Sequence, residues 1–302
     1  MSLRPFARSH VARVLSLLSS LALAWTADAS VAAAQNPFDA RVAEFDRDVT
    51  RAGRSPGAIV PLLELWRSYG DVTPATMVST LERLSTDRRL SAPLRAYAGQ
   101  LLGRARLRTG DIDASRRAFA ELGYVAAWPS SFRVVGPFDN EGGAGFTTEH
   151  DPERLRMDAV DGDARFEGRE RSVGWRTYPD VGHYGYVSFD AVFRPDTNVC
   201  GYAETYVTSE RAQPLSLWLG AGGAVAAWWN GEEVFRDDVY RQPDPDRSVA
   251  MVGAARGVNR LLVKVCALES TWGFFARVGD ATGAPATGLT FAPEAGSQRM
   301  RD

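Results

Sequence analysis

The chain has 302 residues, of which 45% are hydrophobic, 24% are charged and 10% are aromatic. This composition excludes a collagen, a disordered tail and a disulfide-rich miniprotein, and it supplies enough apolar residues for a sizeable core. With 35 basic and 37 acidic residues the net charge is −2, so nothing in the charge balance points to nucleic-acid binding. Lys264 is the sole lysine, and every other basic residue is an arginine.

The first segment has the pattern of a secretory signal peptide. Three arginines precede an uncharged apolar run over residues 14–25, and small residues come after it. The run is shorter than the roughly 18 apolar residues that a membrane-spanning helix needs. We therefore expect residues 1–34 to be removed, with cleavage before Ser30 or before Gln35. The mature protein is then expected to be periplasmic or extracellular, without a transmembrane segment.

Residues 35–127 are predicted to form a string of helical hairpins. Apolar residues recur at helical spacing in five successive stretches, beginning near Val42 and ending near Leu122. Thr73-Pro74 and Ser91-Ala92-Pro93 each supply an N-cap residue and then a first-turn proline, which is typical of a helix start.

The last two predicted helices resemble a tetratricopeptide repeat. The residues that carry this resemblance are Leu102-Gly103, Gly110-Asp111-Ile112, Phe119 and Leu122. Arg106 and Ser115 depart from the pattern, because the family usually has an aromatic residue and an alanine there, which puts close packing of the two helices in doubt. A single repeat cannot bury its own apolar face, so the other helices are expected to act as degenerate repeats or to lean on the C-terminal part of the chain.

After Trp128 the apolar period changes from helical to twofold. Nine short β-rich runs are predicted, at Phe132–Val135, Tyr184–Phe193, Cys200–Val207, Leu215–Leu219, Val225–Trp229, Glu232–Phe235, Val249–Val252, Leu261–Cys266 and Gly273–Val278. Asn230-Gly231 between two of them is a strong hairpin signal. The pattern predicts a multidomain α+β chain, with an antiparallel β-sandwich over residues 128–282 and a flexible C-terminal tail over residues 283–302.

The β half resembles the galactose-binding-like jelly-roll domains of secreted bacterial enzymes. The matching segments are 215–220, 226–231, 257–265 and 272–274. This resemblance implies a jelly-roll fold and a general role as a binding module. Residues 134–143 are also similar to large exported bacterial proteins in which helical repeats precede the β region and a transglutaminase-like domain comes after it, and nothing in this chain matches that catalytic part.

The two cysteines of the chain, Cys200 and Cys266, are expected to form a disulfide, because cysteines of exported proteins usually pair. The loop-entropy relation gives such a bridge about 4 kcal/mol of stabilisation. Two buried free thiols are the alternative. A nucleophilic cysteine could use only His150 or His183 after signal cleavage, and neither lies in a recognisable catalytic motif.

Oxygen ligands cluster at Asp139, Asn140 and Glu141 and again at Asp244 and Asp246, which raises the question of a calcium site. Ordinary turn chemistry explains the same residues, so we predict no metal. The sequence has no zinc-protease motif, nucleophile elbow, phosphate loop or dinucleotide fingerprint, so we expect no cofactor and no enzymatic activity.

Aromatic residues are plentiful in the β half, and exposed rings can stack on sugars. The binding candidates are Trp228, Trp229, Trp272 and Tyr202. Because Trp228 and Trp229 are consecutive in a strand, one faces the core, and the other is either a binding platform or covered by the helices.

These observations favour an exported non-catalytic binding or scaffolding protein. The sandwich is expected to contact a carbohydrate or a protein, and the helices a protein partner, so the partner is a protein or a cell-envelope glycan. The alternative is an accessory or N-terminal part of a secreted transglutaminase-like or hydrolytic enzyme.

Overall fold

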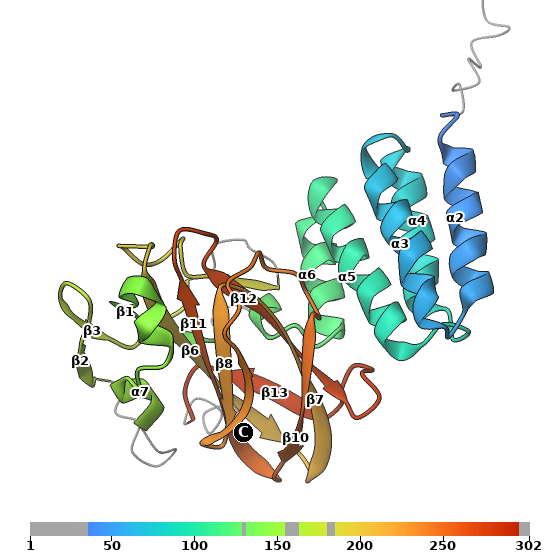
Figure 1. Ribbon diagram of the computed structural model, residues 1–302. Helices are drawn as coiled ribbons and strands as arrows, with labels where there is room; N and C mark the ends of the chain where they lie inside the picture. Colours follow the sequence, from blue (N-terminus) through green and yellow to red (C-terminus); the bar gives the residue numbers. More distant parts are fainter. Residues whose placement is uncertain (1–35, 129–130, 155–162, 180–184, 296–302) are drawn as a thin grey trace, which may run out of the picture.

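The computed structural model describes residues 36–128, 131–154, 163–179 and 185–295, and it consists of an array of helices followed by antiparallel sheets (Figure 1). The predicted signal peptide lies outside the described residues. None of the helices within these ranges combines the length and apolarity that a membrane-spanning segment needs.

The helices follow the predicted order. They are α2 (Asp39–Ala52), α3 (Ile59–Arg67), α4 (Pro74–Thr86), α5 (Ala92–Arg108) and α6 (Ile112–Glu121), with a short 3-10 turn η3 (Val125–Ala127) after them. The proline starts predicted for α4 and α5 are confirmed, although neither Thr73 nor Ser91 makes a side-chain capping bond. Asp111 does cap its helix, accepting a 3.2 Å hydrogen bond from the Ala114 amide.

Helices α5 and α6 pack closely despite the departures from the repeat pattern. A Cβ on Gly103 would lie 2.8 Å from the ring of Phe119, so only glycine permits this approach. Ser115 is fully buried, and its hydroxyl donates a 2.7 Å hydrogen bond to the Gly103 carbonyl. The hydroxyl therefore links the two helices by a hydrogen bond that an alanine at this position could not make.

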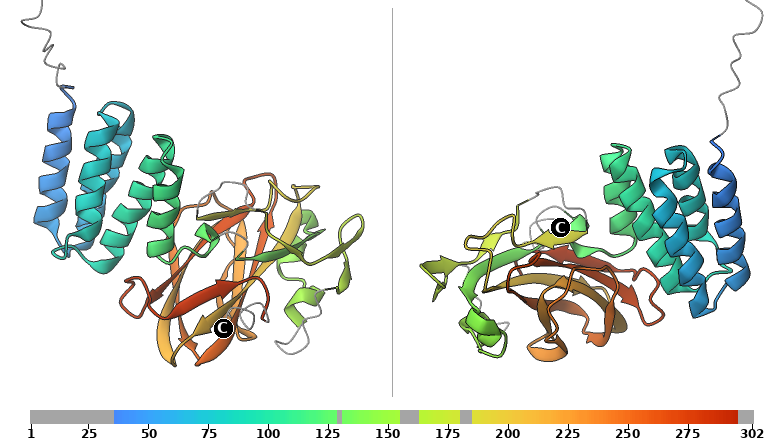
Figure 2. Two further views of the ribbon diagram at one scale, coloured as in Figure 1. Left: turned by 180° about the vertical axis from the view of Figure 1, so that it is seen from behind. Right: turned by 45° about the horizontal axis from the view of Figure 1, so that its top comes forward.

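Two antiparallel sheets form the sandwich, with helices on one side of it in both further views (Figure 2). The strands of the larger sheet run in the order β4-β1-β6-β11-β8-β9, with β13 also paired to β6, and those of the smaller sheet in the order β10-β7-β12-β5. Their bounds are β1 (Arg133–Asp139), β4 (Arg176–Thr177), β5 (Tyr186–Ser188), β6 (Val199–Ser209), β7 (Gln213–Gly222), β8 (Ala224–Trp229), β9 (Glu232–Asp237), β10 (Ser248–Ala254), β11 (Gly257–Ala267), β12 (Gly273–Asp280) and β13 (Leu289–Ala292).

Alternate residues of the two sheets meet in a common core, as the twofold period predicts. Leu215, Leu217 and Leu219 of β7 face Val263 and Val265 of β11 across this core. The predicted Asn230-Gly231 turn joins β8 to β9, and both of its residues have positive φ (53° and 87°).

The C-terminal boundary of the sandwich differs from the prediction. Residues 289–292 form β13, which pairs with β6 from Leu289–Ser209 to Ala292–Tyr206. The predicted flexible tail over 283–302 was therefore wrong for this strand. Its four residues show too little alternation to be recognised as a strand in the sequence, and they are ordered because they pair with the existing strand β6.

The two outer faces of the sandwich have different covers. The outer face of the larger sheet lies under the 3-10 segment η4 (Glu141–Phe146), the short helix α7 (Asp151–Arg154) and the hairpin of β2 (Arg165–Glu167) and β3 (Ser172–Gly174). The outer face of the smaller sheet is directed towards the helices.

Candidate functional site: the groove between helices and sandwich

The helices meet the smaller sheet through the turn that comes after α6. Val278 of β12 donates a 3.0 Å hydrogen bond to the carbonyl of Gly123, and Tyr124 forms an isolated β-bridge with Arg277. A Cβ on Gly123, whose φ is +85°, would lie 2.3 Å from the Val278 carbonyl oxygen. Glycine is therefore required at this junction both by its conformation and by the close backbone approach.

A buried ion pair fixes the same junction. Arg277 is fully buried, and its guanidinium contacts the carboxylate of Asp246 at 2.8–3.1 Å. The hydroxyl of Tyr124 donates to the same carboxylate at 3.2 Å, and the ring of Trp218 lies 4.8 Å from the guanidinium carbon. The charge is thus fully compensated, so this group of residues holds the two parts of the molecule together.

Residues 242–247 lie between the helices and the smaller sheet. A Cβ on Gly220 of β7 would lie 1.8 Å from the backbone oxygen of Asp244, so the segment runs directly against the strand. Two prolines, Pro243 and Pro245, flank that aspartate.

Two adjoining hollows lie along this segment, and together we call them the interdomain groove. Hollow A has a volume of about 340 Å³, and hollow B one of about 370 Å³, both in the range of small-ligand sites. Asp244 and Pro245 line both hollows. Hollow A is lined mainly by apolar and aromatic side chains, among them Ile59, Leu63, Leu94, Tyr97 and Trp218.

Hollow B has a more polar lining, supplied by α5 and by the smaller sheet. Gln100 and Arg104 come from α5, and Tyr186 and Phe275 come from β5 and β12. Gln100 is fully buried, yet neither its amide nitrogen nor its amide oxygen has a hydrogen-bond partner within the described part of the chain. The hydroxyl of Tyr186 is likewise buried and unpartnered there. Unpaired buried polar groups are costly, and a bound ligand would satisfy these.

Charges of both signs border hollow B. Burial is the main cause that lowers the pKa of Arg104, with neighbouring Arg108 as a second cause, and its guanidinium lies 5.2 Å from the ring of Trp66. Burial also raises the pKa of Tyr186 above its ordinary value, so its hydroxyl keeps its proton and can both donate and accept. Asp244 adds a carboxylate that is 58% exposed.

The four aromatic residues proposed from sequence lie elsewhere and are all buried. Trp229 and Trp272 belong to the core between the sheets, at 4% and 0% exposure. Trp228 and Tyr202 lie on the outer face of the larger sheet, at 9% and 0% exposure. Trp228 is therefore covered, as one prediction had it, but by the elements over the larger sheet instead of by the helices.

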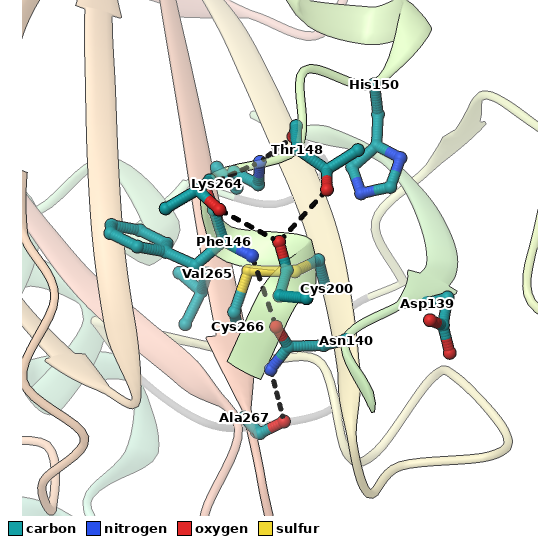
Figure 3. Close-up of a disulfide and its surroundings, with 12 residues drawn as sticks. Asp139, Asn140, Phe146, Thr148, His150, Cys200, Lys264, Val265, Cys266 and Ala267 are labelled. Carbon is teal, nitrogen blue, oxygen red and sulfur yellow. Dashed lines mark hydrogen bonds between the residues drawn. A yellow bond between two sulfur atoms is a disulfide. The ribbon is translucent and has the colours of Figure 1, made fainter. Parts of the chain in front are cut away.

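The predicted disulfide between Cys200 and Cys266 is present and joins directly opposed residues of β6 and β11 (Figure 3). It lies on the outer face of the larger sheet. The segment that contains Asn140 and Phe146 lies over it. The bridge closes a long loop within one sheet and leaves no free thiol for catalysis.

The oxygen-rich turn at Asp139, Asn140 and Glu141 has structural partners. The Asn140 amide donates to the carbonyl of Ala267 at 3.1 Å and accepts from the Phe146 amide at 3.1 Å (Figure 3). Asp139 and Glu141 both pair with the guanidinium of Arg169. Among the described residues no group of three or more acidic, histidine or cysteine side chains has an arrangement that could hold a metal ion.

The sole lysine is also buried on this face. Lys264 donates to the carbonyls of Phe146 (3.1 Å) and Thr148 (2.7 Å) and to the carboxylate of Glu153 (2.7 Å). The three protons of the ammonium group thus meet three acceptors. His150 lies nearby with its ring 4.9 Å from that of Phe138, and burial is the main cause that lowers its pKa.

Sequence reasoning did not identify the groove as a site. It noted Asp244 and Asp246 as oxygen ligands, whereas Asp246 binds Arg277 and Asp244 borders the groove. Gln100 had no distinguishing signal beyond being a polar residue within an otherwise apolar stretch of α5, flanked by Gly99 and Leu101. That interruption is the one feature that could have drawn attention to it.

No family model matches the chain, and no curated protein matches it. Similar solved structures include a β-glucosidase from Kluyveromyces marxianus in complex with glucose, at a TM-score of 0.29 and 11% identity over 49% of this chain and 15% of the glucosidase. The match to an anti-sigma factor domain-containing protein has a TM-score of 0.28 and 12% identity, and it covers 35% of this chain and 39% of that protein. The PA14 domain of the MpAFP antifreeze protein has a TM-score of 0.25 and 10% sequence identity, and the match covers 32% of this chain and 50% of that domain's chain. The chain thus spans half or less of the length of each of these three proteins.

Proposed function

We propose that the chain is an exported, non-catalytic binding protein whose ligand occupies the interdomain groove. The single observation that carries the proposal is the Gln100 amide, which is fully buried at hollow B and unpartnered by any described residue. Natural proteins leave few such groups unpaired, and a ligand with matching polar groups would pair this one.

The architecture supports the same proposal. Residues from α5 and from the smaller sheet face each other across hollow B, and the Tyr124 hydroxyl, which donates to the Asp246 carboxylate paired with Arg277, joins the segment after α6 to the sheet side of the groove. We further propose that the sandwich has the galactose-binding-like jelly-roll topology and that the helices are degenerate tetratricopeptide-like repeats, as the sequence resemblances imply.

Binding without turnover is the expected behaviour. The purified chain is to be screened against soluble glycans, peptidoglycan fragments and peptides, with product analysis of every ligand that binds. A Leu107→Trp variant adds bulk to the lining of hollow B and should abolish binding. Ile112→Trp is the matched control, because Ile112 is exposed and lies outside both hollows. Hydrolysis of any ligand, or equal binding by the Leu107→Trp variant, would refute the proposal.

A further inference from the structure

We infer that hollow B holds a neutral sugar ring, with Gln100 and Tyr186 as its main hydrogen-bonding residues. This inference rests on the proposed function and names the ligand class for the same groove. Three features carry it: the donors and acceptors that the unpartnered groups offer, the apolar surface beside them and the balance of charge around them.

The unpartnered groups favour hydroxyls. The Gln100 side chain offers two N–H donors and one carbonyl acceptor, and the Tyr186 hydroxyl offers one donor and an acceptor. A ligand must therefore supply donors and acceptors together in a small volume. A sugar does so, because each of its hydroxyls both donates and accepts and neighbouring hydroxyls can meet both ends of one amide.

The apolar part of the lining fits the other side of a sugar ring. Phe275 and Phe119 belong to hollow B, and their rings lie in the cluster that joins the helices to the smaller sheet. The tilted pair of Tyr186 and Phe275, with centroids 4.8 Å apart, places a phenol hydroxyl and an aromatic surface on the same wall. The C–H groups of a sugar pack against such a surface while its hydroxyls reach the polar groups.

The charges favour a neutral ligand. Arg104 and Asp244 are the charged residues that line the hollow, and their charges have opposite signs, so the lining itself has no net charge. Asp244 also pairs with Arg247 at 3.7 Å, outside this lining. An extended peptide is less suitable, because its backbone groups are spaced along the chain and an apolar side chain in hollow B would leave Gln100 and Tyr186 unpaired.

The test is titration calorimetry of the full chain with glucose, galactose, N-acetylglucosamine and their short β-1,4-linked oligomers. At least one should bind saturably. Gln100→Leu should weaken that binding by about tenfold or more, and Tyr186→Phe, which removes a single oxygen, by about three- to tenfold. Neither variant removes a hydrogen bond to a described residue, so both should fold.

Matched controls come from groups that have partners elsewhere. Gln213→Leu and Tyr240→Phe remove an amide and a hydroxyl that lie outside the groove, so sugar affinity should stay unchanged. Thermal unfolding supplies an independent readout, because Gln100→Leu should raise the midpoint in the absence of sugar. If Gln100 had a merely structural role, the same substitution would lower the thermal midpoint.

The outcomes separate this inference from the proposed function. If no sugar in the panel binds below about 10 mM, or if a bound sugar is unaffected by both groove variants, the sugar assignment is wrong. If instead a dipeptide binds and Gln100→Leu weakens it, the sugar assignment is again wrong while the groove remains a binding site for another class of ligand. If Leu107→Trp leaves the binding of every ligand unchanged, the proposed function fails as well.

Discussion

Two fully buried polar side chains, one on each outer face of the sandwich, differ in how they are paired. Over the larger sheet, Lys264 meets three acceptors and Asn140 is bonded through both its nitrogen and its oxygen. Over the smaller sheet, Gln100 is as deeply buried and has no partner among the described residues. Each face also holds a group of the other kind, because His150 Nε2 is unpartnered among the described residues over the larger sheet and Arg277 is paired with Asp246 beside the smaller one. Satisfied groups stabilise a fold, whereas an unsatisfied buried group lowers its stability, and the proposed ligand would offset that loss.

The largest effect should come from removing the buried lysine. Lys264→Met leaves the Glu153 carboxylate, which is 10% exposed, and two backbone carbonyls without their donor. We expect the free energy of unfolding to fall by about 3–5 kcal/mol, measured by urea denaturation. Arg154→Met on the same face is the control, since that guanidinium is 59% exposed and should contribute less than about 1 kcal/mol. A loss below about 1 kcal/mol for Lys264→Met would contradict the structural role of this face.

Removing the disulfide should have the next largest effect. A Cys200→Ser, Cys266→Ser double variant should lose about 2–4 kcal/mol in urea denaturation, because the bridge restricts the unfolded chain. Sugar binding should persist, since the bridge lies on the face opposite to the groove. Loss of binding in a variant that is still folded would show that the two faces are coupled.

Acidification should destabilise the cover of the larger sheet through His150. Its folded-state pKa lies below the ordinary value of 6.5, so the unfolded chain binds more protons and the free energy of unfolding falls as the pH drops below about 6.5. The slope from one such group is at most about 1.4 kcal/mol per pH unit. The free energy of unfolding of the wild type, measured by urea denaturation, should therefore fall relative to that of His150→Phe as the pH is lowered below about 6.5, and parallel curves would exclude this role.

The smallest predicted effect is an increase, not a decrease, in the free energy of unfolding. Gln100→Leu should stabilise the ligand-free protein by about 1 kcal/mol, because it replaces an unpaired buried amide by an apolar group of similar size. Gln213→Leu should be neutral or destabilising, since that amide donates to the Ser209 hydroxyl at 2.9 Å. If both variants lost the same free energy of unfolding, Gln100 would behave like an ordinary hydrogen-bonded amide, and the contrast between Gln100 and Lys264 would disappear.

Local patterns predicted most of the fold. The proline starts of α4 and α5, the Asn230-Gly231 turn and the cysteine pair all depend on properties of adjacent residues or on simple pairing, and each is confirmed. The groove could not be predicted in this way. It exists because Gly123 and Gly220 let distant backbone segments approach, and those contacts join parts of the chain that no local period relates.

The aromatic candidates illustrate the same limit. Trp228 and Trp229 have the alternation of a strand, which correctly gives them opposite faces. Alternation does not say what covers the outer face, and the residues of η4 and β2 that do so lie much earlier in the sequence, at Phe146 and Phe166. Exposure therefore could not be assigned from the strand alone.

Because its sole lysine is buried, the folded protein should not react with reagents that modify lysine side chains. The Lys264 side chain is 1% exposed at the centre of β11, so reagents that acylate side-chain amines find no target on the folded chain. A protease that cuts only after lysine has one possible site, between Lys264 and Val265, and reaches it only when the larger sheet opens. Cleavage by such a protease therefore reports the opening of the sandwich without a dye, a tag or an engineered reporter, and at high protease concentration its rate becomes the rate of opening.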